Sequence, residues 1–301
     1  MNFLINTLKP RDGFDDNTES VESLGSLMRG SLQPSWLEAN YPTKNLQTVV
    51  ETVFSRLDGS TGTVGYHLSQ SMGGGKTHTL LCLGLLSKNP QLLQTYFPSV
   101  QVFDKRPAKI ICIDGRLNHP NGIWGTVAEQ LGRKEHFNAF YSPLKAPDPD
   151  QWRTLLNGER VLILIDELPY YLDGALATTV GNSDLCTVSQ HALTNLFLAC
   201  ADSNETRQVA IVMTDLNAEA YPDGSQSIQN ATTQVLLTLG SEGEKVLETL
   251  QPVELETNDL YHILRRRLFQ GEPDPEKVRE IASAYREALR KAATNSNSLS
   301  S

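Results

Sequence analysis

Tyr66-His-Leu-Ser-Gln-Ser-Met-Gly-Gly-Gly-Lys-Thr-His-Thr-Leu80 is the stretch of sequence that decides the fold. It follows the short β-branched run Thr63-Val64 and leads into an apolar, helix-like pattern that reaches Leu86. A strand, a glycine-rich turn and a helix in this order are the context that a phosphate-binding loop requires. The three glycines let backbone N–H groups approach an anion that a Cβ atom would keep away.

This loop predicts a site for the phosphates of a nucleotide. Lys76 can reach the β- and γ-phosphates, and Thr77, at the helix start, can place its hydroxyl on Mg²⁺. The positive end of the helix adds to the field at the anion. The predicted contact residues are Ser71, Met72, Gly73, Gly74, Gly75, Lys76, Thr77 and His78.

The loop departs from the usual pattern at one position, because Gln70 stands where the first glycine is expected. That glycine eases the entry turn, whereas the last glycine, the lysine and the threonine do most of the phosphate binding. The alternative interpretation is a flexible glycine turn followed by a basic residue. His78 is expected to be a packing or surface residue rather than a catalytic one.

Arg160-Val-Leu-Ile-Leu-Ile-Asp-Glu-Leu-Pro169 is the second informative motif. Five apolar residues predict a buried strand, and its carboxyl end is where ligands bind in open α/β sheets. Asp166 can then hold the Mg²⁺ shell, and Glu167 can polarise an attacking water. The alternative is a strand followed by acidic residues that cap a helix starting near Pro169.

A third buried strand, Gln208-Val-Ala-Ile-Val-Met-Thr-Asp215, ends in polar residues. A side chain at that edge commonly senses the γ-phosphate, and Thr214 is the first candidate, with Asp215 and Asn217 behind it. An equally good interpretation is a strand end capped by turn-forming residues.

The remaining elements alternate between helix and strand. The pattern predicts helices over 46–57 (capped by Thr43), 122–140, 185–201, 259–269 and 274–293, strands over 109–114 and 251–255, and a proline-rich loop over 142–150. This alternation predicts an α/β fold with a parallel, doubly wound sheet of five strands and right-handed crossovers.

Composition narrows the function classes. The chain has 301 residues, 39% of them hydrophobic, and a net charge of −9, which does not indicate a surface that wraps nucleic acid. Its four cysteines lie far apart, so buried reduced thiols and a cytoplasmic location are expected. No signal peptide and no membrane span is predicted, and no membrane partner is expected.

These motifs together resemble the AAA+ and origin-recognition-type branch of P-loop ATPases. The resemblance implies the sheet order 5-1-4-3-2 and a short helical lid formed by the closing helices. A narrower resemblance is to the domain-of-unknown-function-499 family, carried by Asn40-Tyr-Pro-Thr, the glycine loop, the Asp166-Glu167 pair, and Pro252-Val followed by Ile263-Leu-Arg-Arg-Arg-Leu-Phe269. Members of that family are longer ATPases, often encoded near DNA methyltransferases and phage-defence genes. The resemblance therefore implies an ATPase fragment, and any nucleic-acid partner rests on it alone.

The expected organisation is a polar N-terminal segment at 1–38, an ATPase core at 39–257, a helical lid region at 258–293 and a disordered tail at 294–301. ATP hydrolysis in an assembly usually needs an additional cation. The stretch 241–251 contains Lys245 but no arginine, so Arg265, Arg266 and Arg267 are the alternatives, with Arg267 as the assigned candidate. A solvated basic helix face is the plainer interpretation of these arginines.

Three functional classes fit the sequence. The first is an ATPase that binds Mg²⁺-ATP and drives a larger assembly, through self-association or a multi-protein complex, and is slow in isolation. The second is a nucleotide-gated binding module with little hydrolysis. The third is a small-molecule kinase, which Glu167 argues against, because a water-activating acid is unhelpful where water must be excluded.

Overall fold

The computed structural model of the chain describes residues 9–10, 22–60, 62–69, 75–201, 204–214, 246–250, 259–271 and 274–297, and positions 233, 235, 237 and 238. The chain divides into two compact units. One comprises residues 22–37 and 42–254, and the other comprises residues 1–21, 38–41 and 255–301. The predicted phosphate-binding loop and strand motifs all belong to the first of these, which is called the core unit below.

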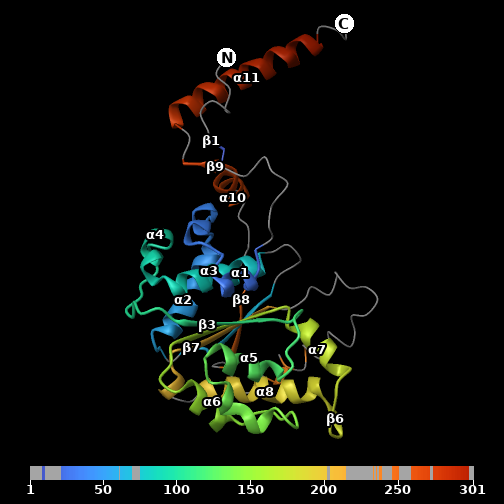
Figure 1. Cartoon of the computed structure of the whole chain (residues 1–301). Helices are drawn as coiled ribbons and strands as arrows, with labels where there is room; N and C mark the ends of the chain where they lie inside the picture. The colour runs from blue at the N-terminus through green and yellow to red at the C-terminus, as the bar shows by residue number, and fades with distance from the viewer. Residues whose placement is uncertain are drawn as a thin grey trace. The chain divides into compact units, whose positions relative to one another are not determined.

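The core unit is built on a five-stranded parallel sheet with the order β3-β4-β7-β2-β8. Its strands are β2 (Gly65–Leu68), β3 (Lys109–Asp114), β4 (Val161–Asp166), β7 (Val209–Thr214) and β8 (Leu247–Leu250). Counted along the chain and read from the β8 edge, this is the expected order 5-1-4-3-2, although short additional strands shift the labels. The strands β2 and β3 are not adjacent in the sheet, and the crossover between them includes the helix α3 (Lys76–Lys88) (Figure 1).

Helices cover both faces of this sheet, so the central strands are buried on both sides. On one face lie α1 (Leu24–Arg29), α2 (Lys44–Leu57) and α3 (Lys76–Lys88), and on the other α5 (Gly122–Gln130), α6 (Pro149–Leu156) and α8 (Leu185–Ala201) (Figure 1). Alternate residues of β4 enter the two cores: Leu162 and Leu164 pack with the first set, Ile163 and Ile165 with the second. The near-continuous apolar strands read from the sequence therefore reflect burial on two faces.

Along the chain, the shorter elements of the core unit lie mostly in the connections between these helices and strands. They are the 3₁₀-helices η2 (Pro34–Ala39, shared between the units), η3 (Pro90–Leu92), η4 (Lys134–Phe140) and η5 (Asn204–Thr206), the helices α4 (Leu93–Tyr96) and α7 (Leu168–Leu176), and the hairpin strands β5 (Thr179–Val180) and β6 (Ser183–Asp184).

Several expected boundaries were wrong. The helix expected over 122–140 is two elements, because α5 ends at Gln130 and Gly132 adopts a left-handed φ of 72° before η4 begins. The loop expected over 142–150 ends early, since Asp148 caps α6 by accepting a hydrogen bond from the Gln151 N–H. The fifth strand is β8 at 247–250, whereas the predicted range 251–255 lies outside the described residues.

The start of the chain also differs from expectation. Residues 22–37 belong to the core unit, although the sequence suggests a polar segment up to residue 38. Leu24, Leu27 and Leu37 are 1–2% exposed, and they pack with α2 and α3. The predicted cap of α2 is confirmed, because the Thr43 hydroxyl accepts a hydrogen bond of 3.2 Å from the Leu46 N–H.

The second unit contains α10 (Asp259–Leu268), α11 (Pro275–Asn297) and an antiparallel pair of β1 (Lys9–Pro10) with β9 (Phe269–Gln270). The helix α11 extends four residues into the tail expected from residue 294. Tyr41 stacks on His262 with ring centroids 4.9 Å apart, and Arg266 donates a 2.8 Å hydrogen bond to the Asn40 carbonyl. Thus Arg266 helps to hold this unit together.

Within the described residues, no helix combines the length and the apolar character that crossing a bilayer would need.

Candidate functional site

The candidate site lies at the carboxyl edge of the sheet. The strands β3, β4 and β7 are in register and parallel, and they end at Asp114, Asp166 and Thr214. The next strand in the sheet, β2, leads into the glycine loop and α3. Polar side chains that are far apart in the sequence therefore meet at one edge, as the strand motifs predict.

Asp166 is the centre of the hydrogen bonds at this edge. The residue is 4% exposed, and its carboxylate accepts one hydrogen bond from the Thr77 hydroxyl at 2.8 Å and one from the Thr214 hydroxyl at 2.6 Å. Both oxygens of the carboxylate are therefore used, and the three side chains come from α3, β4 and β7. Thr77 and Asp166, the two predicted metal ligands, lie within direct contact of each other.

Part of the predicted phosphate-binding loop lies outside the described residues, namely Ser71, Met72, Gly73 and Gly74. Gly75 precedes α3 with a left-handed φ of 75°, a conformation that favours glycine, and α3 begins at Lys76. Lys76 is close enough to Glu167 to act on its charge. His78 packs against Trp36, with ring centroids 4.5 Å apart, in keeping with its expected packing role.

Glu167 has an unusual backbone conformation. Its φ of 55° and ψ of 38° make it the single non-glycine residue with positive φ among the described residues. The Glu167 N–H donates a 3.1 Å hydrogen bond to the Thr214 hydroxyl. Gly115 leaves the necessary space, since a Cβ atom there would lie 2.0 Å from the Glu167 carbonyl oxygen. The neighbouring strands thus hold the turn after Asp166 in a strained form.

The two carboxylate oxygens of Glu167 have different surroundings. Oε1 accepts a 3.3 Å contact from the Arg116 guanidinium, whereas Oε2 is buried and accepts no hydrogen bond from the described residues. Burial raises the pKa of Glu167 above its ordinary value, and the nearby Arg116 opposes that rise. An unpartnered carboxylate oxygen with a raised pKa is an acceptor suited to a proton from water.

Arg116 and Gly115 are the functional candidates that the sequence reasoning missed. Arg116 also lies 3.7 Å from the Asp114 carboxylate, and its own side chain is 57% exposed. The available signal was Asp114-Gly-Arg, a polar turn directly after a buried strand. Arg267 belongs to the second unit, where its side chain is exposed on α10.

Metal ligation by protein side chains alone is not supported here. Among the described residues, no group of three or more His, Cys, Asp or Glu side chains could hold a metal ion. The Thr77 hydroxyl and the Asp166 carboxylate, which are in contact, are the kinds of oxygen donor that Mg²⁺ accepts alongside water and phosphate oxygens.

No curated protein matches the chain. Similar solved structures include DnaA from Aquifex aeolicus bound to AMPPCP (13% identity, TM-score 0.37, covering 78% of this chain and 55% of that chain). Domain III of the replication initiation protein DnaA from Thermotoga maritima matches with 13% identity and a TM-score of 0.37, covering 78% and 74%.

Cdc6p from Pyrobaculum aerophilum matches with 16% identity and a TM-score of 0.40, covering 82% of this chain and 54% of that chain. The chain thus spans about half the length of Cdc6p and of Aquifex aeolicus DnaA.

The family match is more specific. The model of the DUF499 N-terminal domain matches residues 104–236, which run from the segment before β3 to beyond β7 and include Asp166, Glu167 and Thr214. The resemblance read from the motifs is therefore confirmed. Residues 104–236 are therefore similar to the DUF499 N-terminal domain, within an α/β chain whose five-stranded parallel sheet brings Thr77 into contact with Asp166.

Proposed function

We propose that the chain binds Mg²⁺-ATP and hydrolyses it, with Glu167 as the group that accepts a proton from the attacking water. The observation that carries the proposal is the unpartnered, buried Oε2 of Glu167 next to the Thr77–Asp166–Thr214 hydrogen bonds. A base needs a free lone pair at the reacting atom, and Oε2 supplies one at the edge where ligands bind in this class of sheet.

The other residues have positioning and binding roles in this proposal. Lys76 and Gly75, with Ser71, Met72, Gly73, Gly74 and His78, hold the phosphates at the N-terminus of α3. Thr77 and Asp166 hold Mg²⁺, which would neutralise charge on the phosphate oxygens. Thr214 fixes both Asp166 and the backbone of Glu167, so it orients the base in addition to its predicted γ-phosphate contact.

A nucleotide-gated module with little hydrolysis is the second candidate, and Arg116 favours it. The Arg116 guanidinium contacts Oε1 of Glu167 at 3.3 Å. A carboxylate in an ion pair is a weaker base than the same carboxylate without its partner. Hydrolysis would then be slow until a partner moves Arg116. From the family resemblance, that partner belongs to a larger assembly in DNA modification or phage defence, in the cytoplasm.

Replacement of Glu167 by Gln tests the proposal. The amide keeps the size of the side chain but cannot accept the proton, so turnover should fall by about 10²-fold or more while ATP binding is retained. Phosphate release and calorimetric ATP binding would be measured in parallel. Glu129→Gln is the matched control, because that carboxylate is 62% exposed on α5 and should change neither quantity.

Lys76→Ala tests the binding half of the proposal. The lysine begins α3 and lies at the site edge rather than in the core, so its loss should abolish ATP binding without unfolding the protein. ATP affinity that is unchanged in Lys76→Ala would show that the phosphates bind elsewhere. Hydrolysis by Glu167→Gln at the parental rate would assign water activation to another group.

A further inference from the structure

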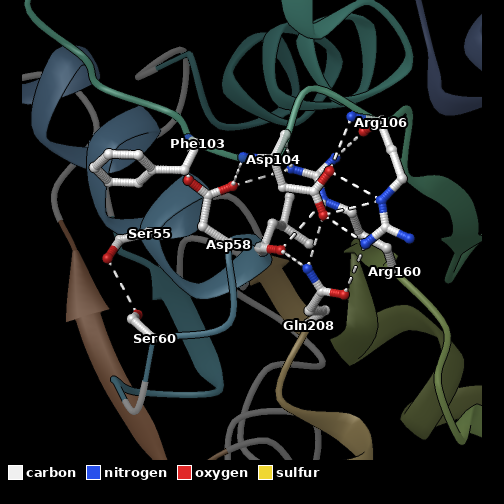
Figure 2. A network of polar contacts seen from close by, with 9 residues as sticks. Ser55, Asp58, Ser60, Phe103, Asp104, Arg106, Arg160 and Gln208 are labelled. Atoms are coloured by element: carbon white, nitrogen blue, oxygen red, sulfur yellow. Dashed lines mark hydrogen bonds and ion pairs between the residues drawn. The ribbon is translucent and has the colours of Figure 1, made fainter.

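Phe103 is the most exposed of the large hydrophobic side chains that the structure describes, with 86% of its surface accessible. Its backbone is nevertheless fixed. The Phe103 N–H donates a 2.7 Å hydrogen bond to one oxygen of Asp58, and the Asp104 N–H donates a 3.2 Å bond to the other. Figure 2 shows the ring pointing away from the polar network that holds its backbone.

That network anchors the Phe103 segment to three strands of the sheet. The Asp104 carboxylate accepts hydrogen bonds from Arg106 at 2.6 Å and from Gln208 at 2.9 Å, and lies 3.7 Å from Arg160 (Figure 2). Arg160 directly precedes β4, Gln208 directly precedes β7, and the segment itself leads into β3. A ligand that binds Phe103 would therefore meet a side chain whose backbone is already ordered, which reduces the entropy cost of binding.

A polar hollow of about 540 Å³ lies beside the ring. The described residues that line it include no lysine or arginine; they are Glu51, Ser55, Asp58, Gly59, Ser60, Ser99, Gln101 and Phe103. Asp58 already uses both oxygens for the backbone N–H groups. Glu51 is exposed and forms no ion pair within the described part of the chain, so its carboxylate is available to a ligand.

We propose that this surface is a docking site for an arginine-bearing segment of a partner protein. A guanidinium can stack on an aromatic face and form a bidentate pair with a carboxylate, whereas an ammonium offers only a point charge. Phe103 and Glu51 supply these two contacts on the lining of one hollow. A phosphate-bearing partner is disfavoured, since the described lining of the hollow contains carboxylates and no lysine or arginine.

The position of this surface gives it a consequence for the core unit. The polar network around Asp104, called the Asp104 clamp below, holds the starts of β3, β4 and β7. The ends of the same strands carry Asp114, Asp166 and Thr214. A partner docked at Phe103 would thus be attached to the rigid sheet at the edge opposite the candidate site. The docking proposal does not depend on ATP hydrolysis, so either can fail without the other.

The experiment measures binding of a short, end-blocked peptide of alternating arginine and glycine by calorimetry at low salt. The parental protein should bind it, and Phe103→Ala and Glu51→Gln should each weaken binding by about two- to fivefold. Phe103→Leu should weaken it as well, because leucine lacks the aromatic face. Tyr285→Ala and Glu129→Gln are the controls, since both side chains are exposed elsewhere. Phe103 is exposed, so its variants should fold normally.

Three results would overturn the proposal. Affinity that is the same in Phe103→Ala would mean that the acidic chain attracts the peptide non-specifically. Full affinity in Phe103→Leu would mean that the side chain at position 103 binds apolar groups rather than a guanidinium. Equal binding of the glutamate analogue of the peptide, or of single-stranded DNA, would mean that the class of partner is wrong.

Discussion

At the scale of single residues, Glu167 combines backbone strain with an unsatisfied side chain. A left-handed conformation at a non-glycine residue costs on the order of 1–3 kcal/mol and persists where the surroundings enforce it. Here the enforcing contacts are the hydrogen bond from the Glu167 N–H to Thr214 and the close approach of Gly115. Strain next to a buried, unpartnered oxygen is typical of a reacting group rather than of a helix cap.

The Arg116–Glu167 pair makes a prediction for the pH dependence of turnover. Burial raises the pKa of Glu167, and the guanidinium opposes this, so removal of Arg116 should raise the pKa further. Because the base works only when deprotonated, activity in Arg116→Ala should be lost at a higher pH than in the parent. The measurement is the acid limb of kcat/KM against pH.

Arg153→Ala is the matched control for Arg116→Ala, because Arg153 pairs with an exposed Asp150 on α6. Its acid limb should coincide with that of the parent. An acid limb that stays in place in Arg116→Ala, or moves to lower pH, would show that Arg116 does not act on the reacting carboxylate.

At the scale of elements, buried charges join the end of α2 to the starts of β3 and β4. Arg160 is 6% exposed and donates hydrogen bonds to the carbonyls of Leu57, Asp104 and Arg106. It lies 3.5 Å from Asp58 and 3.7 Å from Asp104, so its charge is paired as well as hydrogen-bonded. These contacts join the end of α2 to the starts of β3 and β4.

Asp104→Asn should weaken the Asp104 clamp, and the resulting loss of stability should depend on pH. The hydrogen bond from Arg106 is the main reason that the pKa of Asp104 is lowered on folding, and Gln208 and Arg160 add to it. The stabilisation is therefore complete above the unfolded pKa of about 4, and it is lost as the pH falls through the folded value. At neutral pH the variant should lose about 1–2 kcal/mol of the free energy of unfolding.

Urea unfolding of Asp104→Asn at several pH values measures this effect. The parent should lose stability below about pH 4, and the variant should show a smaller loss over the same range. Asp150→Asn is the control, since that side chain is 87% exposed and a surface change should stay within about 0.5 kcal/mol. Equal stability of parent and Asp104→Asn at neutral pH would show that the contacts of the Asp104 carboxylate do not stabilise the fold.

At the scale of the whole molecule, the supply of cations limits the candidate site. Within the described part of the core unit, Arg116 is the arginine at Glu167, and its charge is already shared with Asp114. Arg266 is engaged with Asn40 and Tyr41 in the second unit, whereas Arg267 is exposed on α10. Arg267 is therefore the arginine of α10 best able to act on another chain.

If Arg267 acts in trans, ATP turnover per chain should rise with protein concentration. A missing trans-acting cation can cost about 10³- to 10⁵-fold, so the dilute protein should turn over below about 1 s⁻¹. Arg267→Ala should bind ATP normally and lose the rise with concentration, while Arg266→Ala should instead destabilise the second unit. Brisk hydrolysis by a demonstrated monomer, independent of concentration, would place the necessary cation in cis.

The sequence by itself determined the elements whose signals are local. Three glycines before Lys76, and apolar runs that end in Asp114, Asp166 and Thr214, depend on backbone freedom and on burial of a strand on two faces. Both are properties of consecutive residues, so the parallel sheet and the polar edge where its strands end could be predicted. The sheet order came from the family resemblance, and the structure has the same order.

Only the tertiary structure decided which side chains meet. Arg116 and Glu167 are 51 positions apart in the sequence and come together because β3 and β4 are adjacent and in register. Arg56 and Arg160 look like surface residues in the sequence, yet both are buried, because backbone carbonyls at strand and helix ends accept their hydrogen bonds. Such contacts depend on register and packing between distant segments, which no local pattern records.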